Sequence, residues 1–304
     1  MTTRNMHKSV GCPLSLMVAL LGACSTGRVN NSSHDLSVQD GPVALEDFAG
    51  ADFVSGSGDM ICAGGCYTMY AHSDHTLYSV DLSTKSLKLV GAFNAPLVSG
   101  GEDVITDLAV APDNTIYVVS QTTLYTASAT DGHVTKIGSV GACGTYNVAL
   151  SFTPDNKLYV ADYNGEFCRI DYTVTPPTVT PIAKLSGNLA VTGDLVAVDD
   201  GTMYASAYDL SDTSTQSNNL LIKVDPATAT TTTVGSTGFE RLFGVAFQQG
   251  QVFGFTHDGT GRVITIDVQT GVGTLFNTFN DPMTGSPISF AGAGVNALVS
   301  PTIM

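Results

Sequence analysis

The chain has 304 residues, of which 43% are hydrophobic and only 13% charged, with 32 glycines and no tryptophan. This composition excludes a helical or coiled-coil protein, whose exposed faces need many Glu, Lys and Arg residues, and it favours short strands joined by turns in one large β domain. The formal net charge of −15 excludes nucleic-acid binding and a basic membrane-surface patch, because an acidic surface repels phosphate groups. Cations and neutral glycans are compatible partners.

Residues 1–24 have the three parts of an export signal. A basic head with Arg4 and Lys8 precedes an apolar run at residues 10–21, and the segment ends in Leu21-Gly22-Ala23-Cys24. The apolar run is about a dozen residues long, well short of the roughly 20 that a membrane-spanning helix needs. The segment is therefore predicted to direct export rather than to span a membrane.

The end of this segment resembles the bacterial lipobox, in which the cysteine thiol is joined to diacylglycerol before cleavage on its N-terminal side. The resemblance implies that residues 1–23 are removed and that Cys24 carries lipid, including palmitate, as a membrane anchor. Ser25 follows the cysteine, where Asp is the familiar inner-membrane retention signal, so the resemblance points to the outer membrane. Residues 24–58 are rich in Ser, Gly, Asn and Asp and are predicted to form a flexible tether. A first irregular strand near residues 45–54 is the alternative.

A short hydrophobic-aromatic pattern recurs through residues 59–304. Its aromatic positions are Tyr70, Tyr117, Tyr159, Tyr204 and Phe253, which follow one another at steps of 47, 42, 45 and 49 residues. Before the later four comes an apolar strand that ends in a tight turn, such as Pro112-Asp113-Asn114. After each comes a third strand, such as residues 77–81, then a polar turn and a fourth strand, such as residues 87–90.

Four short antiparallel strands in a unit of about 45 residues form one blade of a β-propeller. The pattern resembles propellers of the NHL and YVTN types across residues 60–300. We predict an all-β chain with five four-stranded blades, in which residues 288–299 pair with the N-terminal blade and close the ring. A sixth blade, shared between this tail and residues 42–60, is the alternative; an up-and-down barrel or a β-solenoid would also repeat.

Four cysteines lie beyond the signal region, an even number for an exported protein. Cys143 precedes the first strand of the third unit and Cys168 opens its third strand, two points that lie at the same end of a blade. This placement predicts a Cys143–Cys168 disulfide, which leaves Cys62 and Cys66 as a second pair. Metal ligation by the four cysteines is the rival interpretation, although their spacing is not that of two CxxC knuckles.

The connections of such a propeller divide between two faces. The turns between first and second strands and between third and fourth strands are short, whereas the other connections are longer and more varied. Long loops on a rigid scaffold commonly carry binding sites, so we expect any site on the long-loop face. The candidates there are Glu102, Asp103, Asp107, Asp162, Asp194, Asp209, Arg241, His257, Asp258, Tyr146, Tyr163 and Tyr208.

Asp107 and Asp194 occupy the same repeat position, five residues before Pro112 and Asp199. Both would start an innermost strand beside the central channel, where facing carboxylates could hold Ca²⁺ through oxygen ligands. The alternative is that the two side chains bind neighbouring backbone N–H groups. Nearby, His72-Ser73-Asp74-His75 is either a metal-binding fragment or a polar hairpin tip.

Three functions are compatible with these features, and no hydrolase, zinc-protease or nucleotide-binding motif is present in the sequence. We expect a non-enzymatic surface lipoprotein whose propeller face binds a protein or a glycan. The second function is a metal-dependent hydrolase or lactonase that recruits Glu102, Asn147, Asn188 and Asp194. The third is a scaffold in an envelope complex. An exposed aromatic patch would favour binding, and a divalent ion at the channel mouth would favour an enzyme.

Overall fold

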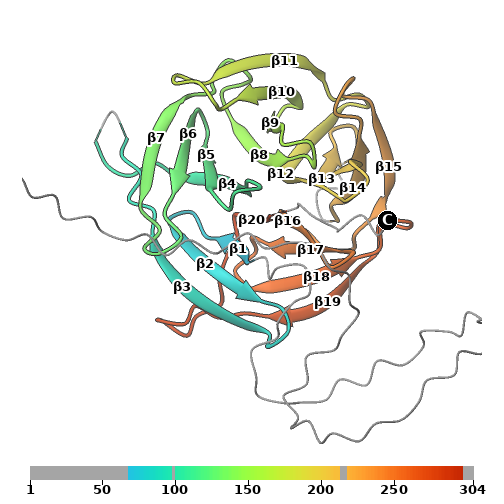
Figure 1. Ribbon diagram of the computed structural model, residues 1–304. Helices are drawn as coiled ribbons and strands as arrows, with labels where there is room; N and C mark the ends of the chain where they lie inside the picture. Colours follow the sequence, from blue (N-terminus) through green and yellow to red (C-terminus); the bar gives the residue numbers. More distant parts are fainter. Residues whose placement is uncertain (1–67, 98–99, 213–217, 297–304) are drawn as a thin grey trace, which may run out of the picture. The chain divides into compact units, whose positions relative to one another are not determined.

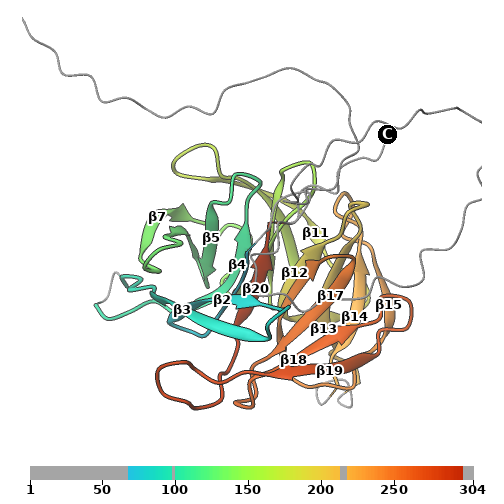
Figure 2. The ribbon, with the colours of Figure 1, turned by 60° about the horizontal axis from the view of Figure 1, so that its bottom comes forward.

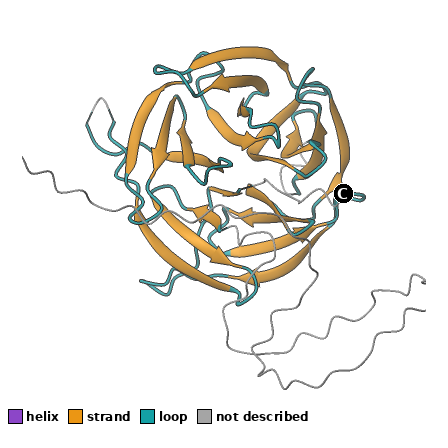
Figure 3. Ribbon diagram, in the orientation of Figure 1, coloured by secondary structure: helices purple, strands orange, loops and turns teal. Residues whose placement is uncertain are grey.

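The computed structural model describes residues 68–97, 100–212 and 218–296 of the chain. The chain divides into two units, Met1–Gly58 and Asp59–Met304, and every described residue belongs to the second. The described residues form twenty β-strands, and no helix is found among them (Figure 3). Accordingly, this part of the chain contains no helix with the length and apolar character needed to cross a membrane.

The strands form five antiparallel sheets of four, which are the blades of a five-bladed β-propeller (Figure 1). This confirms the predicted fold class and blade count. Blade 1 holds, from the axis outwards, β20 (Gly292–Val295), β1 (Met69–His72), β2 (Thr76–Asp81) and β3 (Ser86–Ala92). Blade 2 holds β4 (Ile105–Val110), β5 (Ile116–Ser120), β6 (Thr123–Ala127) and β7 (Val134–Ser139), and blade 3 holds β8 (Asn147–Phe152), β9 (Leu158–Asp162), β10 (Glu166–Asp171) and β11 (Thr178–Lys184). Blade 4 holds β12 (Leu189–Ala197), β13 (Met203–Asp209), β14 (Leu220–Val224) and β15 (Thr231–Ser236), and blade 5 holds β16 (Leu242–Gln248), β17 (Gln251–Thr256), β18 (Arg262–Ile266) and β19 (Gly273–Thr278).

The ring is closed by β20, which comes from the end of the chain but is the innermost strand of blade 1. It pairs antiparallel with β1, in a register that sets Met69 opposite Val295 and Ala71 opposite Ala293. In Figure 2, β20 stands beside β4 near the axis. The pairing covers the edge that β1 would otherwise leave open, and this confirms the role predicted for the C-terminal tail.

The recurring aromatic residue packs each blade against the next one. Tyr70 of blade 1 joins a hydrophobic cluster with Leu108 of blade 2, and Phe253 of blade 5 joins one with Met69 of blade 1. Each of the five hydrophobic clusters lies between two successive blades. The pattern recurs in the sequence because every blade needs the same apolar contact with its neighbour.

The turns that follow the innermost strands use residues suited to a left-handed backbone. Asn114 and Asn156 end the equivalent turns of blades 2 and 3 with φ of 68° and 60°. In blades 4 and 5 the corresponding turns contain Gly201 and Gly250, with φ of 82° and 76°. Asn and Gly tolerate positive φ better than other residues, which explains why these turns were recognisable in the sequence.

A disulfide joins the connection before β8 to β10 within blade 3. The Cα atoms of Cys143 and Cys168 are 5.8 Å apart, which confirms the predicted bridge. Cys24, Cys62 and Cys66 lie outside the described residues. The lipid anchor and the second bridge therefore stay predictions.

Candidate functional site

The connections lie on two opposite faces of the propeller, as the sequence predicted. One of them, here called the loop face, carries the connections between blades and those between the second and third strands of each blade. Its larger segments are residues 93–97, 100–104, 140–146, 163–165, 185–188, 210–212, 237–241, 257–261 and 279–291. The other, the turn face, carries short turns such as residues 111–115 and 153–157.

Exposed apolar side chains are concentrated on the loop face. Eight large hydrophobic residues are exposed among the described residues, and five of them belong to loop-face connections. These five are Leu97, Val104, Tyr146, Leu210 and Met283. The other three are Val174 and Val272 on the turn face and Leu275 in the outer strand β19. The five residues belong to four separate connections and do not form one continuous patch.

Three tyrosines from separate segments form an aromatic patch on the loop face, here called the tyrosine patch. Tyr146 precedes β8, Tyr163 follows β9 and Tyr208 lies near the end of β13. The ring centroids of Tyr146 and Tyr163 are 5.8 Å apart, and those of Tyr163 and Tyr208 are 6.1 Å apart, both edge to face. All three were candidates from the sequence, and the structure brings them together at blades 3 and 4.

Asp162 holds the two loops that carry Tyr146 and Tyr163. Its carboxylate is buried, and its two oxygens accept the N–H groups of Tyr146 at 2.8 Å and of Asn164 at 2.7 Å. A Cβ atom at Gly144 would overlap this carboxylate, so the glycine allows the close approach. Asp162, a candidate ligand residue from the sequence, therefore acts by holding the two tyrosine-bearing loops.

Arg241 and His257, both of blade 5, lie together on the loop face next to blade 1. Arg241 Nη2 lies 3.1 Å from His257 Nδ1, and His257 Nε2 lies 3.3 Å from Asp74 Oδ1. The ring of Phe243 stacks on the imidazole at 4.7 Å between centroids. The hydrogen bond from His257 lowers the pKa of Asp74. This group of contacts ties the β1–β2 loop to blade 5.

Sequence reasoning missed two members of this group. Asp74 was noted only within a possible metal fragment, and nothing in the sequence pointed to Phe243. Their shared partner His257 lies in a different blade from Asp74 and follows a different strand from the one that holds Phe243.

The remaining acidic candidates have partners within their own blade or loop. Asp103 accepts the Tyr125 hydroxyl hydrogen at 2.9 Å, Asp209 accepts the Ser211 N–H at 2.8 Å, and Asp258 pairs with Arg262.

The hairpin tip at residues 72–75 places its two histidines in different environments. His72 is fully buried, and burial lowers its pKa to about 4. Its Nδ1 lies 2.8 Å from the Ser73 carbonyl oxygen, so Nδ1 carries the hydrogen and Nε2 is a buried acceptor without a protein partner. His75 is exposed, 3.7 Å from the Glu102 carboxylate. Among the described residues no group of three or more His, Cys, Asp or Glu side chains could hold a metal ion.

Asp107 in β4 and Asp194 in β12 lie together at the axis, as their shared repeat position predicted, but both are completely buried. This corrects the expectation that they belong to the ligand face. The innermost strands approach closely enough to cover them, because small residues occupy the equivalent positions in the other three strands. These are Ala149, Gly244 and Gly292. A Cβ atom at Gly292 would overlap both Asp107 Oδ1 and His72 Nε2.

The two carboxyl groups collect one N–H group from each of the five innermost strands. The donors occupy one repeat position and are Leu108, Leu150, Leu195, Val245 and Ala293. Asp107 accepts the first two, at 2.8 Å on Oδ1 and 2.5 Å on Oδ2. Asp194 accepts the other three, with Oδ2 at 2.6 Å from the N–H nitrogen of Val245 and 3.4 Å from that of Ala293. The aspartate pair therefore links all five blades at the axis.

Burial favours the protonated form of this pair. It raises the pKa of both carboxyl groups well above the ordinary value, and repulsion from Asp194 raises the pKa of Asp107 further. Among the described residues Asp194 Oδ1 has no hydrogen-bond partner, whereas both oxygens of Asp107 accept N–H groups. A hydrogen on Asp194 Oδ1 would therefore not face an N–H donor.

Calcium does not fit this pair. Ca²⁺ is held by six to eight oxygen ligands that direct lone pairs at the ion. Here those lone pairs accept N–H groups, whose positive ends would repel a cation. The alternative derived from the sequence, carboxyl groups bound to neighbouring backbone N–H groups, is the arrangement that the structure contains.

The fold defines a five-bladed β-propeller whose innermost strands are linked at the axis by two buried carboxyl groups. Within that class, the chain belongs to the family described as "Repeat of unknown function (DUF6923)", whose model matches residues 108–286. The matched residues run from β4 to the β19–β20 connection, so they cover blades 2 to 5. No curated protein matches the chain.

Several solved structures are similar to the chain. One, described as "Crystal structure of Nidogen/Laminin Complex", is 13% identical with a TM-score of 0.51, over 77% of this chain and 99% of that chain. A protein of unknown function from Bacteroides thetaiotaomicron VPI-5482 is 16% identical with a TM-score of 0.48, over 76% of this chain and 65% of that chain. Another from Bacteroides caccae is 9% identical with a TM-score of 0.44, over 77% of this chain and 100% of that chain. At these identities the likeness concerns the fold alone.

Proposed function

We propose that this chain is a non-enzymatic binding module, exported and anchored by lipid on Cys24, that docks a macromolecular partner through the loop face. The tyrosine patch, in which the exposed Tyr146 contacts Tyr163 and Tyr163 contacts Tyr208, carries the proposal. The Cys143–Cys168 disulfide supports export, since such bonds persist in oxidising compartments. The anchor and the outer membrane follow from the lipobox and from Ser25.

A protein is the partner that these side chains favour over a glycan. Tyrosine rings supply a large contact area at a low cost in conformational entropy. The aliphatic residues Leu97, Val104 and Leu210 add surface that a protein can bury. The net charge of −15 favours a neutral or basic partner.

The hydrolase alternative needs an accessible cluster of Glu102, Asn147, Asn188 and Asp194. Asn147 and Asp194 are completely buried, whereas the Glu102 side chain is exposed beside His75. No observation favours the scaffold alternative over a binding module.

Photo-crosslinking in the native envelope tests the docking face. A photoreactive residue at Tyr146, which is 43% exposed, is compared with one at Val174 on the turn face, which is 42% exposed. We expect one discrete adduct from position 146 and none from position 174. Excess soluble chain should compete for the partner and abolish the adduct, provided that the competing chain has an intact tyrosine patch. Equal adducts from both positions, or none from Tyr146, contradict the proposal.

The anchor is tested separately with Cys24→Ser. The unmodified chain should take up labelled palmitate and partition into detergent, whereas the variant should be recovered in the soluble fraction. Equal partitioning of both chains, without label in either, would rule the anchor out.

A further inference from the structure

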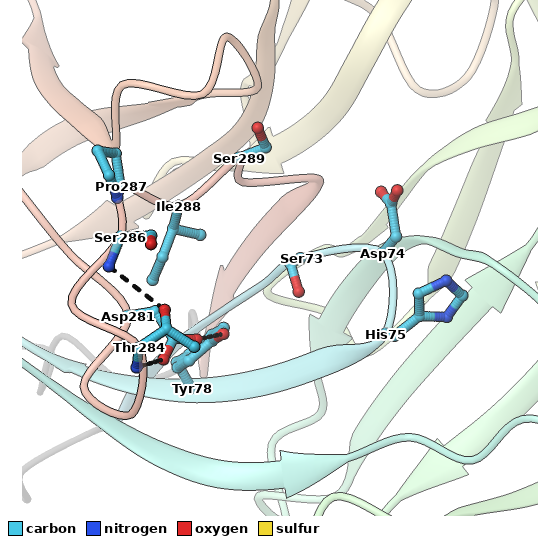
Figure 4. Close-up of a pocket in the computed structure, with 10 residues that line it drawn as sticks. All are labelled: Ser73, Asp74, His75, Tyr78, Asp281, Thr284, Ser286, Pro287, Ile288 and Ser289. Atoms are coloured by element: carbon cyan, nitrogen blue, oxygen red, sulfur yellow. Dashed lines mark hydrogen bonds between the residues drawn. The ribbon is translucent and has the colours of Figure 1, made fainter.

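A pocket of about 310 Å³ opens on the loop face at blades 1 and 5, at a different pair of blades from the tyrosine patch. It is formed by two segments far apart in the sequence, residues 73–78 and residues 281–289 (Figure 4). Its volume lies at the lower end of the range for ligand pockets, roughly 300–1,000 Å³. None of the functions discussed so far uses it.

The walls of the pocket are held in place without a ligand. The Tyr78 hydroxyl donates to Asp281 Oδ2 at 2.6 Å, across 203 residues of sequence. The other oxygen of Asp281 accepts the N–H groups of Met283 at 2.8 Å and Thr284 at 2.9 Å. An isolated bridge between Asn280 and Pro287 closes the base of this loop. A ligand would therefore meet a formed site and need not order the loop on binding.

The lining of the pocket selects against anions. No Lys or Arg side chain lines it, whereas the carboxylates of Asp74 and Asp281 do. The hydrogen bonds from His257 and Tyr78 lower the pKa of Asp74 and Asp281, respectively, so both groups are ionised at neutral pH. A negatively charged ligand would meet these two charges, and His75 is the one basic side chain in the lining.

The same carboxylates are already engaged, which disfavours a cation. Asp281 accepts three hydrogen bonds, and Asp74 is paired with His257 at 3.3 Å. The other polar groups of the lining are the His75 imidazole and several hydroxyls, of Ser286 and Ser289 among others. A hydroxyl group both donates and accepts, and it rotates to suit its partner.

An apolar part completes the lining. Pro287, which is exposed, and Ile288, which is largely buried, contribute carbon atoms beside the hydroxyl groups (Figure 4). Hydroxyl groups next to an apolar wall match the two sides of a sugar ring, which carries hydroxyl groups at its edge and C–H groups on its faces. We propose that this pocket binds one ring of a neutral sugar, either free or at the end of a glycan chain.

Saturation-transfer NMR and titration calorimetry test the pocket with the full folded domain. The probes are the methyl glycosides of glucose, galactose, mannose and N-acetylglucosamine, together with glucosamine and glucuronate. We expect at least one neutral glycoside to bind and glucuronate not to bind. If an oligosaccharide binds more tightly than its terminal monosaccharide, the ligand is a glycan chain. If the two bind equally, the ligand is a free sugar.

Two matched substitutions locate the binding. Ser286→Tyr places a ring at the exposed rim of the pocket, and Ser83→Tyr places the same ring at an exposed serine of the turn face. Sugar affinity should fall at least tenfold in the first variant and stay unchanged in the second. Three results would overturn the proposal. The first is that no neutral glycoside binds, and the second is that Ser286→Tyr binds the sugar as tightly as the parent chain does. The third is that glucosamine binds at least tenfold more tightly than every neutral sugar.

The docking proposal and the sugar-pocket proposal can be refuted separately. Tyr146→Ser should leave sugar affinity unchanged while it removes competition for the crosslinked adduct. Loss of sugar binding in Tyr146→Ser with retention in Ser286→Tyr would place the sugar on the tyrosine patch and refute the pocket.

Discussion

Asp107 and Asp194 have the same position in the repeat and different hydrogen-bond environments. Both oxygens of Asp107 accept N–H groups, whereas Asp194 accepts N–H groups on Oδ2 and its Oδ1 has no hydrogen-bond partner among the described residues. An amide at position 194 fits this pattern, because its oxygen can accept in place of Oδ2 and its NH₂ group takes the place of Oδ1, where no N–H group points. An amide at position 107 cannot, because its NH₂ group would face an N–H donor.

Asn substitutions should therefore have unequal effects. We expect Asp194→Asn to keep the free energy of unfolding within about 1 kcal/mol of the parent chain, and Asp107→Asn to lower it by about 1–3 kcal/mol through an unsatisfied buried group. Urea unfolding followed by circular dichroism measures both. Equal losses would show that Asp194 Oδ1 does not carry a hydrogen.

The raised pKa of the two carboxyl groups also predicts a pH dependence. Unfolded aspartates ionise near pH 4, whereas the folded pair keeps one proton to higher pH because its pKa is raised. Above about pH 4 the folded state thus binds more protons than the unfolded state, and the contribution of the pair to the free energy of unfolding falls as pH rises through the folded pKa. Asp194→Asn lacks this proton, so its stability relative to the parent chain should increase with pH.

The measurement is urea unfolding of both chains across the acid-to-neutral range. His72, whose pKa is lowered to about 4, is present in both chains, so its own titration largely cancels in the difference. A difference that does not change with pH would contradict the raised pKa of the pair.

At the scale of strands, the propeller depends on how closely β20 approaches its neighbours. β20 has the sequence Gly-Ala-Gly-Val, and it is buried along its whole length. Gly292 leaves room for Asp107 Oδ1 and His72 Nε2, and Gly294 leaves room for Leu108. A strand with larger side chains could not reach the axis and close the ring.

Gly292→Ala tests this requirement. Its Cβ atom would overlap Asp107 and His72, so we expect the free energy of unfolding to fall by about 1–3 kcal/mol. The control is Gly141→Ala, where the nearest atom to a new Cβ is the Ser139 Oγ at 3.4 Å, and it should change stability little. Faster amide exchange at Ala293 in the first variant alone would locate the effect in β20.

The Cys143–Cys168 bridge fastens the connection that enters blade 3 to the third strand of the same blade. The two cysteines are separated by 25 residues, so chain entropy predicts a contribution of about 3 kcal/mol. The paired substitution Cys143→Ala with Cys168→Ala should lower the free energy of unfolding by that order and leave the far-ultraviolet spectrum unchanged. A change of spectrum would mean that blade 3 needs the bridge to fold.

At the scale of the whole molecule, the five blades cohere through five apolar clusters and through the aspartate pair at the axis. The clusters act between neighbouring blades only, whereas the aspartate pair contacts all five innermost strands. Blade geometry is therefore fixed from the centre as well as around the ring. That rigidity lets the loop face hold the tyrosine patch and the sugar pocket in defined places.

Blade number, strand order, the ring-closing tail and the blade 3 disulfide could be predicted from the sequence alone. Each depends on signals that are local and repeated, such as the Tyr117 pattern, the Asn114 turn and the position of Cys168 within its unit. The repeat also aligned Asp107 with Asp194 and so placed both at the axis. The separation of loop and turn faces follows from the same repeat.

Only the tertiary structure decided what these side chains do. Whether Asp107 meets a cation or N–H groups depends on how closely four other strands approach it, and that distance is set by Gly292 and other small residues elsewhere in the ring. The pocket needs Tyr78 and Asp281, which no local pattern connects. A sequence repeat records what every blade shares, whereas sites form from residues in which the blades differ.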